Sequence, residues 1–87
     1  MEPWHLLECE KALRRAQGLA QRYPSRALFP FAYRQDNDEL ACWAEGAGAK
    51  VFLVHDFASA GYEDEGAFDT TWDWFRSAID EMIEWDE

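Results

Sequence analysis

His55 and Asp56 form the pair with the clearest potential for chemistry in this 87-residue sequence, since histidine and aspartate side chains bind metal ions. Residues 50–57 are rich in β-branched and aromatic side chains, which predicts a strand. Neighbouring side chains of a strand point to opposite faces, so a regular strand would not let the pair hold one ion. His5 is the one other histidine. We therefore expect no metal, and a structural role in which His55 is hydrogen-bonded near the end of a sheet.

Two acidic runs, at residues 36–39 and 63–65, offer oxygen ligands for Ca²⁺ or Mg²⁺. Neither has the alternating spacing of a calcium-binding loop, so we expect each to be a solvated turn. Ser25, Ser59 and Ser77 all lie outside the G-x-S-x-G motif of an activated serine. We predict that the protein is not an enzyme and uses no cofactor. A small hydrolase that uses its clustered carboxylates is the weaker alternative.

The net charge of −10 is unevenly distributed along the chain. Residues 1–26 hold five basic and three acidic side chains, a local charge of +2, whereas residues 27–87 hold three basic and fifteen acidic side chains, a local charge of −12. Such a surface repels phosphate backbones and anionic lipids, which argues against nucleic-acid or membrane binding. The natural complement is a basic protein. The alternative is that the charge serves solubility alone.

Aromatic side chains beside acidic clusters are a recipe for binding a basic protein, because aromatic groups supply affinity and charge supplies steering. Trp74, Trp85 and Tyr62 are candidates for such exposed anchors, and the alternative is that they fill the core of this small protein. The predicted partner-binding residues are Asp36, Asp38, Glu39, Tyr62, Glu63, Asp64, Glu65 and Trp74.

A helix is predicted from Pro3 to about Tyr23, where Pro24 prevents its continuation. Apolar residues at helical spacing should form its inward face, and the basic residues should largely point away. The predicted inward residues are Leu6, Cys9, Leu13, Ala16 and Ala20, and the predicted outward residues are Lys11, Arg14, Arg15 and Gln17.

Three strands are predicted to follow, at residues 27–33, 39–45 and 50–57. Pro30 cannot donate to a ladder, which places the first of these strands at an edge of the sheet or at a bulge, and we expect the edge. A polar turn at residues 35–38 and a glycine-containing turn at residues 46–49 should connect them. The strand at residues 50–57 should be central, because both of its faces are apolar. Residues 58–67 should form a loop with room for a short strand.

The last predicted element is a helix that Asp69, Thr70 or Thr71 can cap, and Thr70 with Asp73 three residues later approximates a capping box. A stripe of apolar residues should pack it on the sheet, and the acidic residues of its last turns should let the tail fray. The predicted stripe is Trp72, Phe75, Ile79, Met82 and Ile83.

Together these elements predict one α+β domain over residues 1–87, with an N-terminal helix, a mostly antiparallel sheet of three to four strands and a C-terminal helix packed on the sheet. Cys9 and Cys42 should be buried, reduced thiols, and the alternative is a disulfide between them. The sequence has neither a signal peptide nor a long apolar run, so we expect a cytoplasmic protein.

Three segments also resemble the SMI1/KNR4 (SUKH) superfamily. Residues 28–43 are similar to its "hPFA…(G/N)D…hhhh" segment, residues 51–57 to its "V…hDh" strand, and residues 68–75 to its "sFeeF" helix start. The resemblance covers residues 27–84. The N-terminal half of longer members, with its "G…LP…" pattern, has no counterpart in residues 1–26.

This resemblance implies an α+β fold and a non-enzymatic role. Bacterial relatives are commonly immunity proteins that neutralise toxins such as nucleases or deaminases, and fungal relatives act as regulatory scaffolds. The expected function is therefore an immunity protein that binds a basic toxin. The alternative is an adaptor or regulatory module without a toxin partner, which acts alone or as a homodimer.

Overall fold

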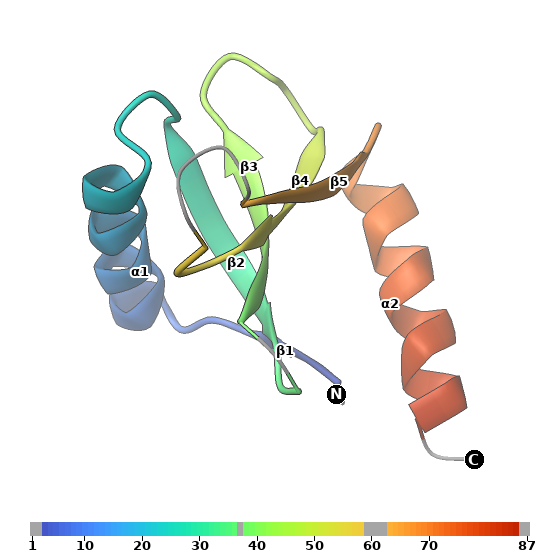
Figure 1. Ribbon diagram of the computed structural model, residues 1–87. Helices are drawn as coiled ribbons and strands as arrows, with labels where there is room; N and C mark the ends of the chain where they lie inside the picture. Colours follow the sequence, from blue (N-terminus) through green and yellow to red (C-terminus); the bar gives the residue numbers. More distant parts are fainter. Residues whose placement is uncertain (1–2, 37, 59–62, 86–87) are drawn as a thin grey trace.

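The computed structural model describes residues 3–36, 38–58 and 63–85, with Trp85 described by its backbone alone. One described helix lies between the first two strands in the sequence, and the other follows the fifth strand (Figure 1). The elements are β1 (Trp4–Leu6), α1 (Cys9–Arg22), β2 (Leu28–Arg34), β3 (Glu39–Ala44), β4 (Val51–His55), β5 (Asp64–Phe68) and α2 (Thr71–Trp85).

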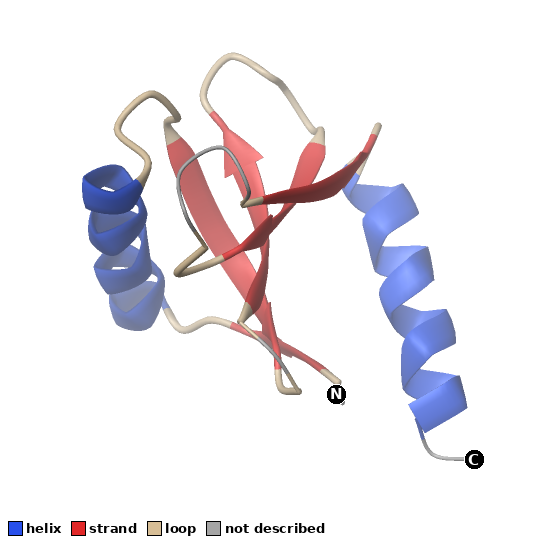
Figure 2. Ribbon diagram, in the orientation of Figure 1, coloured by secondary structure: helices blue, strands red, loops and turns tan. Residues whose placement is uncertain are grey.

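The described strands form a five-stranded sheet in the order β1-β2-β3-β4-β5, and every neighbouring pair is antiparallel (Figure 2). The α+β class, the antiparallel pairing and the central position of β4 are therefore confirmed. The expected number of three to four strands is too small. The strand that was not predicted is β1, which pairs with the outer side of β2, whereas β5 is the short strand for which the segment at residues 58–67 left room.

β1 corrects the prediction of a helix that begins at Pro3. Trp4 is only 1% exposed, because its side chain belongs to the core, and three residues of the strand pair with β2. The backbone N–H of Leu7 then donates to the carbonyl oxygen of Phe31 at 2.9 Å, and α1 begins at Cys9. Burial of one large indole in the core thus overrides the helical pattern of the first turn.

β2 is an inner strand, so the prediction that it forms an edge is wrong. The other position open to Pro30, a bulge, is what the structure shows: the pairing with β3 shifts between Pro30 and Ala32. Phe31 and Ala32, although neighbours, both pack in the same core cluster. The bulge therefore accommodates the missing N–H of proline inside the sheet.

The two helices flank the sheet from opposite sides (Figure 1), and a separate apolar cluster lies on each side. In β3, Leu40 and Cys42 face α1, whereas Ala41 and Trp43 face α2, as the alternation of a strand requires. The α1-side core contains Leu19, Tyr23, Leu28, Leu40, Cys42 and Val54. The α2-side core contains Trp4, Ala32, Ala41, Val51, Trp74 and Ala78.

α1 ends where Pro24 predicts, but its inward face is not the one that apolar spacing predicts. Ala12 and Leu19 are buried, whereas Leu13 is 52% exposed and Cys9 is also exposed. The helix is rotated because two arginine side chains point inward, as the site described below shows.

Of the three predicted caps of α2, the structure shows Thr70: the backbone N–H of Asp73 donates to Thr70 Oγ1 at 3.0 Å. Thr71 fastens this end to the sheet, since its hydroxyl donates to the carbonyl oxygen of Ala49 and accepts from Trp43 Nε1. Ala49 belongs to the turn between β3 and β4, where Gly46 and Gly48 have the positive φ angles of 81° and 63° that favour glycine.

The buried side of α2 differs from the predicted stripe. Trp74 and Ala78 are 3% and 1% exposed, whereas Trp72 and Ile83 are 64% and 56% exposed. The ring of Trp74 packs edge-on against Trp4, with centroids 5.5 Å apart. Because β1 supplies Trp4 as a partner, the helix turns Trp74 inward and Trp72 outward.

This contrast between two tryptophans predicts unequal effects of truncation. We expect Trp74→Ala to lower the free energy of unfolding by about 3–5 kcal/mol, because it leaves a large cavity in the α2-side core. Trp72→Ala should lower it by less than about 1 kcal/mol, since that side chain is mostly in solvent. Urea unfolding followed by circular dichroism measures both values. Equal losses in the two variants would contradict this orientation of α2.

Candidate protein-binding site

Five of the predicted site residues lie at one end of the sheet. Glu39 pairs with His55 of β4, and Val54 of β4 pairs with Asp64, so the starts of β3 and β5 lie on either side of the end of β4. We call this group of carboxylates the acidic end; it consists of Asp36, Asp38, Glu39, Asp64 and Glu65.

The carboxylates of the acidic end act on one another. The pKa of Glu39 is raised, first by desolvation, and the negative charges of Glu65 and Asp36 raise it further. The positive charge of Arg34 opposes this rise. A raised carboxyl pKa means that the ionised form is disfavoured at this position. Desolvation is the main cause, so a further positive charge would oppose only the smaller part of the rise in pKa that is due to Glu65 and Asp36.

Beside His55 of β4, the basic residue that this end contains among the described residues is Arg34. Its Nε donates to Asp36 Oδ1 at 2.7 Å, and its Nη1 forms an ion pair with Glu81 of α2. Within residues 3–36, 38–58 and 63–85, no basic side chain forms an ion pair with Asp38, Asp64 or Glu65. All three of these residues are exposed, so they are open to a partner.

Two predicted partner-binding residues are buried: Glu63 is not part of an exposed surface, and Trp74 has the alternative place expected for it, in the core. Glu63 is 6% exposed, and its Oε2 accepts from Arg26 Nη1 at 2.8 Å. Trp74 is 3% exposed within the α2-side core. Tyr62 lies outside the described residues, as does the side chain of Trp85.

Trp72 is the exposed tryptophan that the sequence placed in the core. Its ring lies 5.8 Å from that of Phe75, and Asp69 and Asp73 beside it are exposed. The length of β5 separates this tryptophan from Asp64 and the acidic end. In the described part of the chain, the expected aromatic anchor and the acidic end are therefore two separate surfaces.

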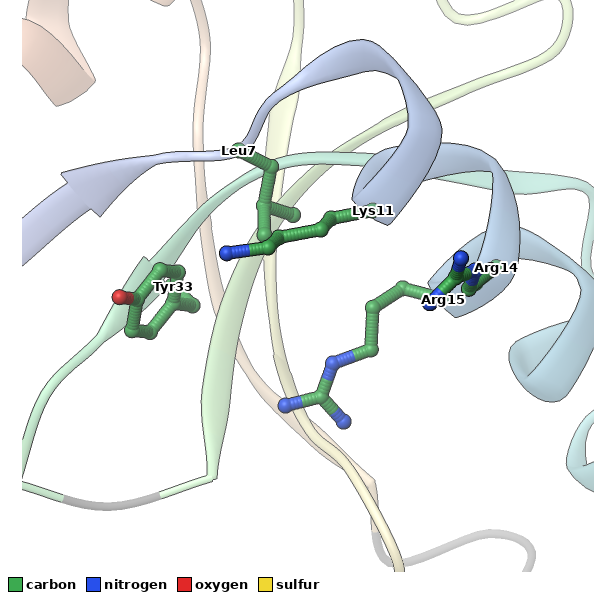
Figure 3. Close-up of a pocket in the computed structure, with 5 residues that line it drawn as sticks. All are labelled: Leu7, Lys11, Arg14, Arg15 and Tyr33. Atoms are coloured by element: carbon green, nitrogen blue, oxygen red, sulfur yellow. The ribbon is translucent and has the colours of Figure 1, made fainter.

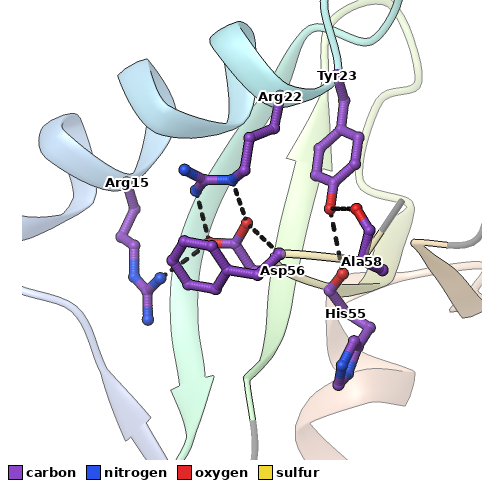
Figure 4. Close-up of polar contacts among 7 residues, drawn as sticks. Arg15, Arg22, Tyr23, His55, Asp56 and Ala58 are labelled. Carbon is purple, nitrogen blue, oxygen red and sulfur yellow. Dashed lines mark hydrogen bonds and ion pairs between the residues drawn. The ribbon is translucent and has the colours of Figure 1, made fainter. Parts of the chain in front are cut away.

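The sequence did not reveal the strongest electrostatic feature of the structure, the fully buried carboxylate of Asp56 (Figure 4). Nε and Nη2 of Arg22 donate to its two oxygens at 2.7 and 2.8 Å, and Nη1 of Arg15 donates to Oδ2 at 2.8 Å. Bidentate guanidinium–carboxylate pairs are among the strongest hydrogen-bonded pairs in proteins. We call Asp56, Arg15 and Arg22 the arginine–aspartate node.

Phe57 covers the node and supplies a further hydrogen-bond donor to the Asp56 carboxylate. Its backbone N–H donates to Asp56 Oδ1 at 2.8 Å, and its φ angle of 67° is unusual for a residue other than glycine. The Arg22 guanidinium lies 4.3 Å from the Phe57 ring centroid, a distance typical of a cation–π contact. The ring nevertheless remains 61% exposed.

A sequence signal for the node existed in the spacing of Arg15 and Arg22. Residues seven apart lie on the same side of a helix, so both guanidinium groups reach one acceptor. The prediction that Arg15 points away from the sheet is therefore wrong. Figure 4 also shows the His55 side chain directed away from Asp56, and its imidazole forms no hydrogen bond with a described residue. His55 is instead hydrogen-bonded at the end of the sheet through its backbone: its N–H donates to the carbonyl oxygen of Glu63 at 2.7 Å, and its carbonyl oxygen accepts from the Tyr23 hydroxyl at 3.4 Å.

Other chemistry has little support in the described residues. No group of three His, Cys, Asp or Glu side chains among them could hold a metal ion. Burial raises the pKa of the Cys42 thiol to about 12, which makes it a poor nucleophile at neutral pH. Cys9 is exposed, contrary to prediction.

Among the described helices, none has the length and apolar character needed to cross a membrane.

Comparison of the chain with protein-family models, with curated proteins and with solved structures found no match.

Loss of the Asp56 charge should destabilise the fold. We expect Asp56→Asn to lower the free energy of unfolding by about 3 kcal/mol, because it leaves two guanidinium groups, about 30% exposed, without their buried counter-charge. Glu10→Gln is the control, since it removes an exposed ion pair with Arg14 that is worth at most about 0.5 kcal/mol. Urea unfolding of both variants measures the difference. A loss in Asp56→Asn no larger than in the control would show that the node contributes little.

The two cysteines should react at very different rates. At about pH 8, we expect a disulfide reagent to label Cys9 rapidly in the folded protein. Cys42 should stay unmodified, because its thiol is buried and protonated. Both thiols should react in urea. Mass spectrometry of labelled peptides identifies the site. Rapid labelling of the folded variant Cys9→Ser would contradict this description of Cys42.

Proposed function

We propose that this protein is a non-enzymatic binding domain whose acidic end docks a basic protein partner. The observation that carries the proposal is the convergence of Asp38, Asp64 and Glu65, exposed and without ion-pair partners among the described residues, at one end of the sheet. Glu39 beside them is held in an environment that disfavours its charge. A site built in this way is complementary to lysine and arginine side chains.

The charge of the whole chain favours the same kind of partner. A net charge of −10 attracts a basic protein over a distance of about one Debye length, which increases the rate of association. Exposed charges at the rim of an interface act mainly on that rate, whereas well-packed central contacts determine the lifetime of the complex. The acidic end thus supplies steering and selectivity.

Among basic partners, we propose a nuclease- or deaminase-type toxin, which makes this protein an immunity protein. Toxins that act on nucleic acids present basic surfaces to phosphate backbones, and an acidic domain can cover such a surface. The resemblance of residues 27–84 to SMI1/KNR4 proteins supports the same role. A regulatory adaptor of that superfamily would use the acidic end on a housekeeping partner, and the identity of the bound protein separates the two roles.

The test is co-expression with each toxin encoded beside this gene, followed by measurement of binding and of cell growth. We expect one toxin to bind and to lose its toxicity. The double variant Asp38→Asn/Glu65→Gln should weaken binding about ten-fold, because two charge contacts of a fraction of a kcal/mol to about 1 kcal/mol each are lost. Binding of the unmodified protein should also weaken as the salt concentration rises from about 50 to 300 mM.

A matched control is Glu8→Gln/Glu45→Gln, which removes the same charge from exposed positions away from the acidic end. It should bind almost as well as the unmodified protein. Equal losses in the two double variants would mean that only net charge matters. Failure of every neighbouring toxin to bind, together with binding of other proteins that is insensitive to salt, would refute the proposal.

A further inference from the structure

A basic pocket lies between α1 and β2, on a protein that is otherwise strongly acidic (Figure 3). Its volume is about 310 Å³, close to the lower limit for pockets that bind small molecules. None of its lining residues is acidic, and three of them carry a positive charge. The lining residues are Leu7, Lys11, Arg14, Arg15 and Tyr33.

The positive charge of this pocket is not cancelled by its neighbours. Arg14 pairs with Glu10, but Arg15 shares the single charge of Asp56 with Arg22, so the arginine–aspartate node keeps one positive charge in excess. Lys11 forms no ion pair with any carboxylate of the described residues. Two uncompensated positive charges therefore lie at the pocket.

The guanidinium group of one donor of the pocket, Arg15, is held in place before any ligand arrives. Arg15 is anchored because its Nη1 donates to Asp56, and this is the one hydrogen bond that its guanidinium forms with the described residues, which leaves further N–H groups to donate. The ammonium group of Lys11 extends toward Tyr33 in Figure 3. The ring of Tyr33 stacks on that of His5, with centroids 5.2 Å apart. Such anchoring lowers the entropy lost on binding.

We propose that this pocket binds a small anion through a carboxylate or phosphate group. Lys11 and Arg15 hold the negative group, Tyr33 supplies an aromatic wall with a hydroxyl, and Leu7 provides apolar contact. A guanidinium fork and an ammonium group together suit the oxygen atoms of either anion. The site is independent of the acidic end, because it uses other elements and the opposite charge.

The test is isothermal titration of the full-length protein, at constant ionic strength, with inorganic phosphate in one series and acetate in another. We expect saturable binding of at least one anion, and the preferred anion identifies the kind of group that the pocket takes. Lys11→Gln should weaken that binding about five- to ten-fold, since it removes one direct charge contact. Lys11 is exposed, so this variant should fold normally.

Lys50→Gln is the matched control, because Lys50 is the only other lysine of the sequence and does not line the pocket. It should change the affinity less than two-fold, although the net charge of the two variants is the same. Absence of saturable binding for both anions would overturn the proposal. Equal weakening in the two lysine variants would also overturn it, because the effect would then be that of net charge.

Discussion

The buried carboxylate of Asp56 is the constraint to which much of this structure responds. A carboxylate that is completely removed from water is unfavourable unless it is paired and hydrogen-bonded. Two arginines of α1 satisfy it, and they do so only when the helix turns its cationic side toward the sheet. This requirement explains why Leu13 is left in solvent while Leu19 is buried.

The same constraint organises the end of β4. Phe57 adopts a positive φ angle and donates its backbone N–H to Asp56, and the Tyr23 hydroxyl donates to the carbonyl oxygen of Ala58 at 2.8 Å. α1 is thereby attached to the sheet through polar contacts as well as through Leu19. Because several donors must meet one acceptor, the alignment of helix and strand is specified more narrowly than apolar packing alone would specify it.

The elements that the sequence predicted well are those whose local signals and tertiary contacts agree. The strand pattern of β3 and β4, the Thr70 cap and the turn at Gly46 and Gly48 all depend on neighbouring residues. Part of the candidate site was predictable for a related reason, since Asp38 ends the turn predicted at residues 35–38 and Glu39 begins β3.

The errors share one physical cause, which is a partner distant in sequence. Trp4 forms a strand because the α2-side core has room for its indole, and Trp74 turns inward because Trp4 is there. Arg15 points inward because Asp56, 41 residues later, accepts its hydrogen bond. A prediction from helical periodicity places arginine on the outward face. It therefore gave the wrong orientation of α1 about its axis.

Contact between Trp4 and Trp74 also has a consequence for synthesis of the protein on the ribosome. β1 to β4 emerge first, and the side of the sheet that carries Ala41 and Val51 stays uncovered until α2 has been translated. A nascent chain with such an apolar surface is a substrate for chaperones and is prone to aggregate. Docking of α2 is accordingly the step that covers this surface and removes the risk of aggregation.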